Sequence, residues 1–546
     1  VSVFATISVL VLYAFRTNLT PSVVRASIMA GAFLIGDLLD RQSNSVNVLS
    51  VAALFILIVW PKAIFSLGFQ LSFTATFAIV AGYSRLKESL PDALANAGSW
   101  WARAIRDGFA VSVVAQLGTM PIIAGSFFQV AWMAPLANLA IGPMVFVTTA
   151  LSVLAVAVAP VTMGLAKLFG GANWLILLAM TKVSVLLASV PGALIDVAKP
   201  TKLAVYGYYA FFVAVLYLPR HRRRLFIAGS TTLLTIYALG SFVLEPERLL
   251  VTMIDVGQGD AILVEYPDGY NMLVDGGHYS PRFDAGERVV LPFLRAKGIR
   301  RLDSVVVSHP HTDHFGGLPA VVSGVRVDEV LHSGVSPTST YFRYWRSVLD
   351  SLGVPNRSVA SGDTLRREGQ VRALILHPGA DFVGQPAPHG TNNASVVMRI
   401  VYGSFSILLT GDAEEEAEHA IVAAGLDLGS TVLKAGHHGS RTSSTSAFIN
   451  RVKPEAVLVS VGAGNKFRHP APEVMARYRS QGTRILRSDA RGAVTIATTG
   501  TGLDISHMVG SDPRLNWLTP REAKSSTSLT GSGISSIMPR DTATKG

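Results

Sequence analysis

The stretch Ser308–Gly317, SHPHTDHFGG, places three histidines and one aspartate within six residues. A lone histidine is more often packed or solvated than a metal ligand, but four donor side chains at this spacing favour a metal site. In an extended loop His309 and His311 share one face, while Asp313 and His314 project to different sides of the same turn. Such a loop can serve two neighbouring metal ions, and its imidazole and carboxylate groups suit zinc, iron or manganese.

The residues around this stretch predict a loop at the end of a strand. Leu302–Val307 precedes it and is rich in valine, which is typical of a buried strand. The pair Gly316 and Gly317 closes it and lets the backbone turn away. We therefore expect the four candidate ligands on a loop that a buried strand holds in place.

The composition of the chain changes near its middle. The 546-residue sequence has a mean hydropathy of +0.40 and only 15% charged residues, which is too apolar for a soluble protein. The excess lies in residues 1–244, a succession of apolar runs, whereas residues 245–509 read as an ordinary globular domain. Residues 510–546 are rich in Ser, Thr and Gly without apolar periodicity, which predicts a disordered tail.

The apolar half is expected to place roughly seven to nine helices in the membrane, some of them shorter than a full crossing needs. The chain opens at Val1 inside an apolar run, so we expect that it lacks its natural amino terminus. The candidate spans are Val1–Phe15, Val23–Leu39, Val46–Val59, Phe65–Gly82, Gly108–Phe127, Met133–Val158, Trp174–Val190, Leu203–Leu218 and Leu225–Val243.

The orientation of these helices has one strong indicator. Arg220, Arg222, Arg223 and Arg224 lie in a tight loop between the last two candidate spans. Positive charge in short loops stays in the cytoplasm, so the final span is expected to carry the chain outward. The sequence therefore predicts a multi-pass protein of the cytoplasmic (inner) membrane with its globular domain outside the cytoplasm.

Three polar residues within the candidate spans, Gln70, Ser72 and Asn138, are candidates for a channel. Polar side chains are costly in lipid and call for partners or for water. Two readings stay open: they join helices through hydrogen bonds, or they line an aqueous path.

Charge and cysteine content limit the chemistry. The formal net charge is +11 and the pI is about 9.8, which fits a polyanionic partner, although the loops of membrane proteins are basic in any case. The chain has no cysteine, so a metal ion must be held by His, Asp, Asn or water.

Two sets of motifs resemble known families. The H-x-H-x-D-H pattern of His309–His314 resembles the signature of the metallo-β-lactamase superfamily. The strings RASIMA, GFQLSFTATFAIV and APLANLAIGP resemble, in this order, the competence domain of ComEC-type DNA-uptake channels. Together they imply a polytopic α-helical membrane domain followed by an α/β metallo-β-lactamase-like domain, an αββα sandwich. The resemblance runs from about Val1 to Ala497, without the further helices and small oligonucleotide-binding-like domain that usually come first in this family.

The resemblance implies further metal ligands. Asp412 in SFSILLTGD matches the carboxylate that bridges two metal ions in the superfamily. His437 in LKAGHHGS is expected as the last ligand, with His438 making a hydrogen bond instead. Where the hydrolases have a third-motif histidine, His389–Val397 reads HGTNNASVV, as in ComEC-like domains. One metal position is therefore expected to be weaker or more hydrated, with the first two loop histidines as its protein ligands.

Two residues are expected to act in catalysis beside two divalent ions, manganese or zinc. Asp313 would ligate a metal ion and orient the attacking water. Lys434 would neutralise charge that develops on a phosphodiester, unless it is an ordinary surface lysine. Because the superfamily acts on lactams, thioesters and phosphodiesters, the metal site alone does not select the substrate.

A further set of residues is expected around the ligands or against the substrate. Asp275, at the end of the strand NMLVDGG, is expected to brace the histidine loop. The motif DVGQGD matches the opening motif of the family's metal domain, although a structural turn is the favoured reading of these residues. The loop VLVSVGAGNKFRHP offers donors for a polyanionic backbone. The remaining candidates of this set are Asp255, Gln258, Asn393, Ser395, Ser440, Asn465 and His469.

The resemblance implies a channel that conducts single-stranded DNA inward, with an outer metal-dependent nuclease that degrades the other strand. The implied partners are DNA, membrane lipid, a DNA receptor and cytoplasmic motor proteins. Two alternatives stay open. The outer domain could bind DNA without cutting it, which the missing third-motif histidine suggests, or the protein could be a membrane-anchored metallo-hydrolase with a substrate other than DNA.

Overall fold

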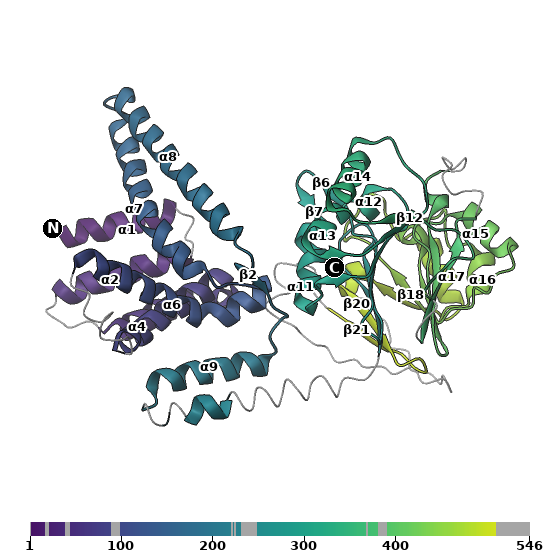
Figure 1. Ribbon diagram of the computed structural model, residues 1–546, viewed down its shortest axis with the longest axis horizontal. Coiled ribbons are helices and arrows are strands. Elements are labelled where there is room, and N and C mark those ends of the chain that lie inside the picture. Colours follow the sequence, from purple (N-terminus) through teal and green to yellow (C-terminus); the bar gives the residue numbers. More distant parts are fainter. Residues whose placement is uncertain are drawn as a thin grey trace, which may run out of the picture. The chain divides into compact units, whose positions relative to one another are not determined.

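The computed structural model describes residues 2–16, 21–38, 44–88, 99–219, 222, 225–230, 248–366, 370–379 and 390–508. The chain forms two compact units, with the main division between Val243 and Leu244 (Figure 1). Several sequence predictions lie outside the described residues. They are the tail 510–546, most of the last candidate span, and Arg220, Arg223 and Arg224; His389, which opens the HGTNNASVV stretch, also lies outside them.

The first unit consists of apolar helices (Figure 1). Three of them, by length and composition, are able to cross a membrane: α6 (Trp100–Phe127), α7 (Ala134–Val158) and α8 (Met163–Ala188). The others in the described part are α1 (Ser2–Arg16), α2 (Pro21–Leu38), α3 (Ser45–Val59), α4 (Leu67–Glu88) and α9 (Lys202–Tyr217). One short antiparallel pair, β1 (Gln129–Ala131) with β2 (Leu194–Asp196), joins the ends of α6 and α8.

Small residues let two of these helices approach closely. A Cβ added to Gly118 of α6 would overlap the Cβ of Ala78 on α4. Close backbone approach at small residues is a common basis of helix association in membranes. A second contact region lies among α2, α3 and α4, where the rings of Phe69 and Phe73 are 4.3 Å apart within a buried apolar cluster.

The three channel candidates all have partners inside this unit. The Nε2 of Gln70 donates to the carbonyl of Ile64 at 2.9 Å. The hydroxyl of Ser72 accepts from Arg25 at 2.6 Å, and the amide of Asn138 donates to Ser112 at 2.8 Å. Through these contacts the three channel candidates join helical segments to one another. Their role in an aqueous path stays a prediction.

The second unit contains two β-sheets. In spatial order, the eight-stranded sheet consists of β12 (Asn356–Ser358), β11 (Val330–His332), β9 (Ser304–Val307), β5 (Asn271–Val274), β4 (Ile262–Glu265), β3 (Leu249–Met253), β20 (Val494–Thr498) and β21 (Asp504–His507). The seven-stranded sheet consists of β13 (Thr364–Arg366), β14 (Val371–His377), β15 (Val397–Tyr402), β16 (Phe405–Leu409), β17 (Val432–Lys434), β18 (Ala456–Val459) and β19 (Arg484–Arg487).

Three apolar clusters show that this unit has four layers. The first cluster lies between the sheets and joins residues such as Val251 and Ile407. The second packs α11 (Leu291–Lys297), α13 (Leu318–Gly324) and α14 (Thr340–Leu352) on the first sheet. The third packs α15 (Glu415–Ala423), α16 (Ser446–Val452) and α17 (Pro472–Ser480) on the second. The predicted αββα sandwich behind a helical membrane domain is therefore confirmed, and Figure 1 shows helices on both sides of the strands.

The strand directions bring several loops to one place. In the first sheet β5, β9 and β11 run parallel, and in the second β16 to β19 do so. The carboxyl ends of parallel strands meet at the same edge of a sheet, where ligands commonly bind. The loops after β5, β9, β16 and β17 carry the candidate metal ligands.

Candidate metal centre

The histidine loop begins where β9 ends. His309 is fully buried, and its Nε2 lies 3.0 Å from Nδ1 of His311, which is exposed. The short helix α12 (Thr312–Phe315) then carries Asp313 and His314. The amide nitrogens of His314 and Phe315 both donate to the carbonyl of His311, which fixes this turn. The loop therefore holds a histidine pair and an Asp-His pair next to each other.

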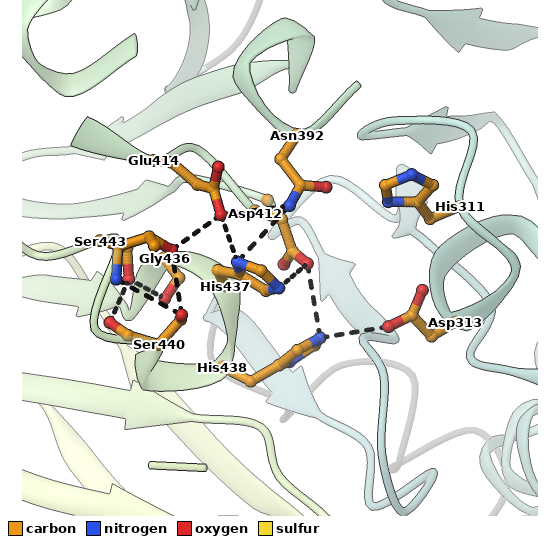
Figure 2. Close-up of polar contacts among 12 residues, drawn as sticks. His311, Asp313, Asn392, Asp412, Glu414, Gly436, His437, His438, Ser440 and Ser443 are labelled. Atoms are coloured by element: carbon orange, nitrogen blue, oxygen red, sulfur yellow. Dashed lines mark hydrogen bonds and ion pairs between the residues drawn. The ribbon is translucent and has the colours of Figure 1, made fainter. Parts of the chain in front are cut away.

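Asp412, which follows β16, lies at the middle of the site. Its Oδ2 is 3.2 Å from Nε2 of His314 and 3.9 Å from Nε2 of His309. The same oxygen is 3.7 Å from Nε2 of both His437 and His438. One buried carboxylate thus faces ring nitrogens of four histidines, which is the arrangement expected of a carboxylate shared between metal ions. In Figure 2 dashed lines join the carboxylate of Asp412 to His437 and to His438.

One set of donors could hold a divalent ion as the side chains stand. Ligand atoms of Asp313, His314, Asp412 and His438 all lie within 4.8 Å of one another. The Nε2 atoms of His314 and His438 are buried and make no hydrogen bond of regular geometry, although both lie within 4 Å of Oδ2 of Asp412. Such an arrangement is unusual for buried polar atoms and fits ligands placed around a cation. Two carboxylates and two imidazoles suit zinc or manganese.

This arrangement differs from the prediction for the double histidine. The sequence favoured His437 as the last ligand and gave His438 a hydrogen bond, but His438 is the one grouped with the other donors. His438 is buried, and its Nδ1 lies 2.9 Å from the carbonyl of Ser460, so that Nε2 points at the centre. His437 is partly exposed, and its Nδ1 lies 2.8 Å from Glu414.

The backbone of the double histidine explains why both rings reach Asp412. His437 and His438 have φ values of 44° and 54°, in the left-handed region that is costly for residues other than glycine. The hydroxyl of Ser443 donates to the carbonyl of Gly436 at 2.6 Å, and the amide of Ser440 donates to the carbonyl of His437 at 2.8 Å. These bonds hold the turn (Figure 2).

Asn392 lies where the third-motif histidine was expected. Its Nδ2 is 3.5 Å from Nδ1 of His437 and 3.4 Å from Glu414, and Figure 2 shows it between His437 and His311. A second ion would therefore find His309, His311 and Asp412 as donors, with His437 and Asn392 beside them. The sequence did not single out Asn392 or Glu414, although both adjoin predicted motif residues.

Asp275 contacts the histidine loop, as a bracing residue should. Its carboxylate accepts from the amide and hydroxyl of Ser308 at 2.8 and 2.6 Å, and lies 2.8 Å from Nδ1 of His314. A carboxylate on the far ring nitrogen directs the other nitrogen toward a metal ion. Asp275 itself adopts φ 60° and is buried.

The structure differs from the role predicted for Lys434. Its side chain is fully buried, forms an ion pair with Asp260 and donates to the carbonyl of Gly411 at 2.7 Å. No part of it reaches the surface, so it cannot meet a phosphodiester directly. Instead it lies 3.6 Å from Asp412, where its charge offsets the charge of the buried carboxylates.

Asp260 is a functional candidate that sequence reasoning missed. It closes the DVGQGD motif, and its Oδ1 lies 3.4 Å from Nδ1 of His438 while its Oδ2 lies 3.8 Å from Nδ1 of His314. Asp260 therefore contacts the Nδ1 side of both rings, opposite the Nε2 atoms that face Asp412. The DVGQGD motif drew attention to this turn, but Asp255 and Gln258 were chosen from it as candidates and Asp260 was not.

The remaining predicted residues mostly hold loops. Asp255 accepts from the amide of Gly257 at 3.2 Å within its own turn. The other contacts are Gln258 with the amide of Gly462, Asn393 with the amides of Glu414 and Ala417, Ser395 with the amide of Asp412, and Ser440 with the hydroxyl of Thr442. Asn465 closes its own loop, and the ring of His469 lies 5.6 Å from the ring of His437. Of this set, Ser395 and His469 lie next to candidate ligands.

Proton positions follow from the charges. Burial opposes the charged form of His438, but Asp412 and Asp260 outweigh it and raise its pKa to about 9. Burial likewise opposes protonation of His314, and Asp412 and Asp275 raise its pKa well above the usual value. Burial also opposes ionisation of Asp412, yet His314 and His438 hold its pKa well below the usual value. The buried carboxylates of the centre therefore stabilise positive charge, either as protons on the histidines or as a metal ion.

Comparisons with known proteins agree with both units. The competence protein family matches residues 1–222, and the metallo-β-lactamase superfamily matches residues 254–463. The chain is 27% identical over 502 residues to ComE operon protein 3 of Bacillus subtilis (strain 168), which covers 88% of this chain and 62% of that protein. It is 32% identical over 252 residues to the competence protein ComA of Neisseria gonorrhoeae, covering 45% of this chain and 31% of that protein.

A third relative extends along most of the chain. The uncharacterized protein YcaI of Escherichia coli (strain K12) is 27% identical over 506 residues, covering 91% of this chain and 62% of that protein. The chain therefore spans less than two thirds of the length of these curated relatives.

The fold and the site define the second unit as a metallo-β-lactamase domain with a candidate site for divalent metal. It is joined to a domain that matches the competence protein family, and the homologues named ComE operon protein 3 and ComA belong to the ComEC family, so the chain has the domain composition of ComEC-type proteins.

Proposed function

We propose that this chain conducts single-stranded DNA inward across the cytoplasmic membrane and that its metal domain, outside the cytoplasm, hydrolyses the strand that is not transported. The observation that carries the nuclease part is the position of Asp412, whose Oδ2 lies within 4 Å of ring nitrogens of four histidines. DNA as the substrate rests on membership of the competence family, with the net charge of +11 as minor support.

The chain's own residues would divide the work as follows. Asp313, His314, Asp412 and His438 would hold one divalent ion, and His309, His311 and Asp412 a second. When bound, such ions lower the pKa of a water and offset the charge of a phosphodiester. Asp313 is less buried than Asp412, so its free carboxylate oxygen can accept a hydrogen bond from a water and orient it.

His437 is placed to contact substrate. Its side chain is 26% exposed, its Nδ1 is fixed by Glu414, and its Nε2 faces the centre. In its doubly protonated form, a ring held in this way donates from Nδ1 to Glu414 and can donate from Nε2 to a phosphate oxygen without rearranging. Lys434, buried behind Asp412, would keep that carboxylate ionised and in place.

A strand-specific import assay tests the whole proposal. Cells that depend on this chain for DNA uptake are given duplex DNA with a different label on each strand. The proposal expects one label inside the cell and the other released as short fragments outside. With Asp412→Ala it expects release to stop. Import of both strands, or fragment release that the variant does not affect, would contradict it.

The same assay separates the alternatives. A domain that only binds DNA would give import without metal-dependent fragments. A metallo-hydrolase with another substrate would give no dependence of import on this chain at all. The partners that deliver DNA and draw it inside, a receptor and a cytoplasmic motor, are proposed from family membership alone.

A further inference from the structure

The loop Gly462–Pro470, between β18 and α17, presents an exposed aromatic ring beside the metal centre. The large hydrophobic side chains that are exposed on the described part of the metal domain are few, and Phe467, at 52% exposure, is one of two aromatic rings exposed by more than half. A solvent-exposed aromatic ring at the rim of a site can stack with a planar group of a ligand. The other ring of similar exposure, Tyr344 on α14, is 53% exposed.

A chain of ring contacts connects Phe467 to the metal ligands. The ring of Phe467 stacks on His469, with centroids 5.8 Å apart and planes 14° apart. The ring of His469 meets the ring of His437 edge to face at 5.6 Å. His437 in turn faces Asp412, with its Nε2 3.7 Å from the carboxylate. A base that lay on Phe467 would belong to a nucleotide close to the reacting phosphate.

Cations stand on both sides of Phe467 in the sequence. The Nζ of Lys466 is 5.0 Å from the centroid of the Phe467 ring, and Arg468 follows directly with an exposed side chain. Aromatic rings that alternate with cations are the common composition of surfaces that bind single-stranded nucleic acid, because bases stack while the cations bind phosphates.

Hydrogen bonds of Asn465 hold the backbone of the loop that carries the ring. The Nδ2 of Asn465 donates to the carbonyls of Gly462 and His469 at 3.0 and 2.7 Å, and its Oδ1 accepts from the amide of His469 at 3.0 Å. Gly462 packs against the DVGQGD turn, where an added Cβ would come within 2.8 Å of the Gln258 nitrogen. A loop whose backbone is already held loses little conformational freedom when a ligand binds.

We propose that Phe467 and His469 form a stacking platform for a base of single-stranded DNA beside the metal centre, with Lys466 and Arg468 bound to the neighbouring phosphates. The proposal rests on the proposed DNA substrate and adds a subsite to it. Stacking is tolerant of sequence because every base has an aromatic face, so the platform would hold a strand without selecting a site.

Binding of base-bearing and abasic strands tests the platform. The full chain in detergent or nanodiscs is titrated, in the presence of chelator so that nothing is cut, with labelled oligothymidylate and with an oligomer of the same length that has no bases. Fluorescence anisotropy gives both dissociation constants. The wild-type chain is expected to bind the base-bearing strand more tightly by a factor on the order of ten.

Three variants give the controls. Phe467→Ala is expected to bring the ratio of the two dissociation constants close to one, and Phe467→Trp to preserve it. Tyr344→Ala removes a ring of matched exposure from α14 and is expected to behave as wild type. Metal content, measured on each variant, checks that the centre has stayed intact.

Three results would overturn the platform. The first is an unchanged ratio in Phe467→Ala, and the second is an equal loss for both strands that Phe467→Trp does not restore. The third is a loss of binding to vesicles of anionic lipid with the ratio unchanged, which would make this loop a membrane contact. Cleavage with metal is measured separately, so a base preference without any cleavage would refute the nuclease and leave the platform standing.

Discussion

His314 and Asp412 face each other across the metal centre, with Nε2 of His314 3.2 Å from Oδ2 of Asp412. The opposite nitrogen of the same ring lies 2.8 Å from Asp275. The two carboxylates come from the ends of strands in different sheets, so this imidazole ties the two halves of the sandwich together. A ligand set built across two sheets requires both to fold before a metal ion can bind.

The two adjacent histidines are expected to differ in their effect on metal binding. His438 belongs to the group with Asp313, His314 and Asp412, so His438→Ala should lower the affinity of that position by roughly tenfold or more. His437→Ala leaves this set of four complete and should retain at least one tightly bound ion. Titration with Mn²⁺ or Zn²⁺, followed by metal analysis of the protein, distinguishes them. Loss of all metal from His437→Ala, with normal content in His438→Ala, would show that His437 is the ligand after all.

Lys434 is expected to stabilise the fold rather than to bind substrate. Lys434→Met leaves Asp260 buried without its ion-pair partner, which should destabilise the metal domain by about 3–5 kcal/mol. The double variant Lys434→Met/Asp260→Asn removes both charges and should recover part of this loss. Pulse proteolysis of the full chain in urea measures the change, and Arg451→Met, an exposed cation on α16, is the control. Normal stability with a higher KM for DNA would favour the original substrate role.

Metal binding is expected to strengthen as the pH rises. The metal-free chain holds a proton on His438, whose pKa is about 9, and that proton must leave before Nε2 can bind an ion. The apparent affinity should therefore increase as the pH rises from neutral toward about 9. Calorimetry in buffers with different heats of ionisation should show proton release on metal binding. An affinity that is constant from neutral pH to about 9 would contradict the charge arrangement described here.

The same raised pKa has the opposite consequence for the metal-free fold. A histidine with a raised pKa in the folded state adds stability below its unfolded pKa, and that contribution is lost as the pH rises through about 9. Metal-free protein should thus become less stable over the range in which metal binding improves. Thermal unfolding with and without chelator at several pH values measures both trends.

The close contact of α4 and α6 predicts a sensitive position in the helical unit. Gly118→Leu should lower the yield and thermal stability of the chain in detergent, because any side chain there overlaps Ala78. Gly142→Leu on α7 is the matched control, since an added Cβ at Gly142 meets nothing within 4 Å. Equal effects of the two substitutions would show that the α4–α6 contact is not tight.

Much of the fold could be predicted because local patterns determine it. The valine-rich strand before His309 and the strands on both sides of DVGQGD are short apolar runs with clear glycine boundaries, and the structure has strands at each. The closeness of His309 and His311 could also be predicted from their spacing, since residues two apart share a face in extended backbone. The αββα sandwich itself was predicted from the resemblance of these motifs to the metallo-β-lactamase superfamily.

The errors concern residues whose surroundings come from distant parts of the chain. Lys434 looked accessible because it stands near a strand end, but β17 is buried at all of its positions, and Asp260 from another sheet neutralises the charge. The sequence ranked His437 above His438 as a ligand, but two consecutive left-handed residues break the alternation on which such arguments depend and turn both rings toward Asp412. Neither the buried ion pair nor the left-handed backbone of the double histidine can be predicted from the local pattern of apolar and polar residues.

Cleavage of labelled DNA by the full chain tests the central claim most directly. Single- and double-stranded substrates are incubated with Mn²⁺, Zn²⁺, Mg²⁺ or chelator, and wild type is compared with Asp412→Ala and with Glu415→Ala, an exposed acidic neighbour. We expect cleavage that requires metal, is abolished by chelator and by Asp412→Ala, and is unaffected by Glu415→Ala. Intact DNA in every condition, from folded protein shown to contain metal, would contradict the nuclease and leave a domain that only binds.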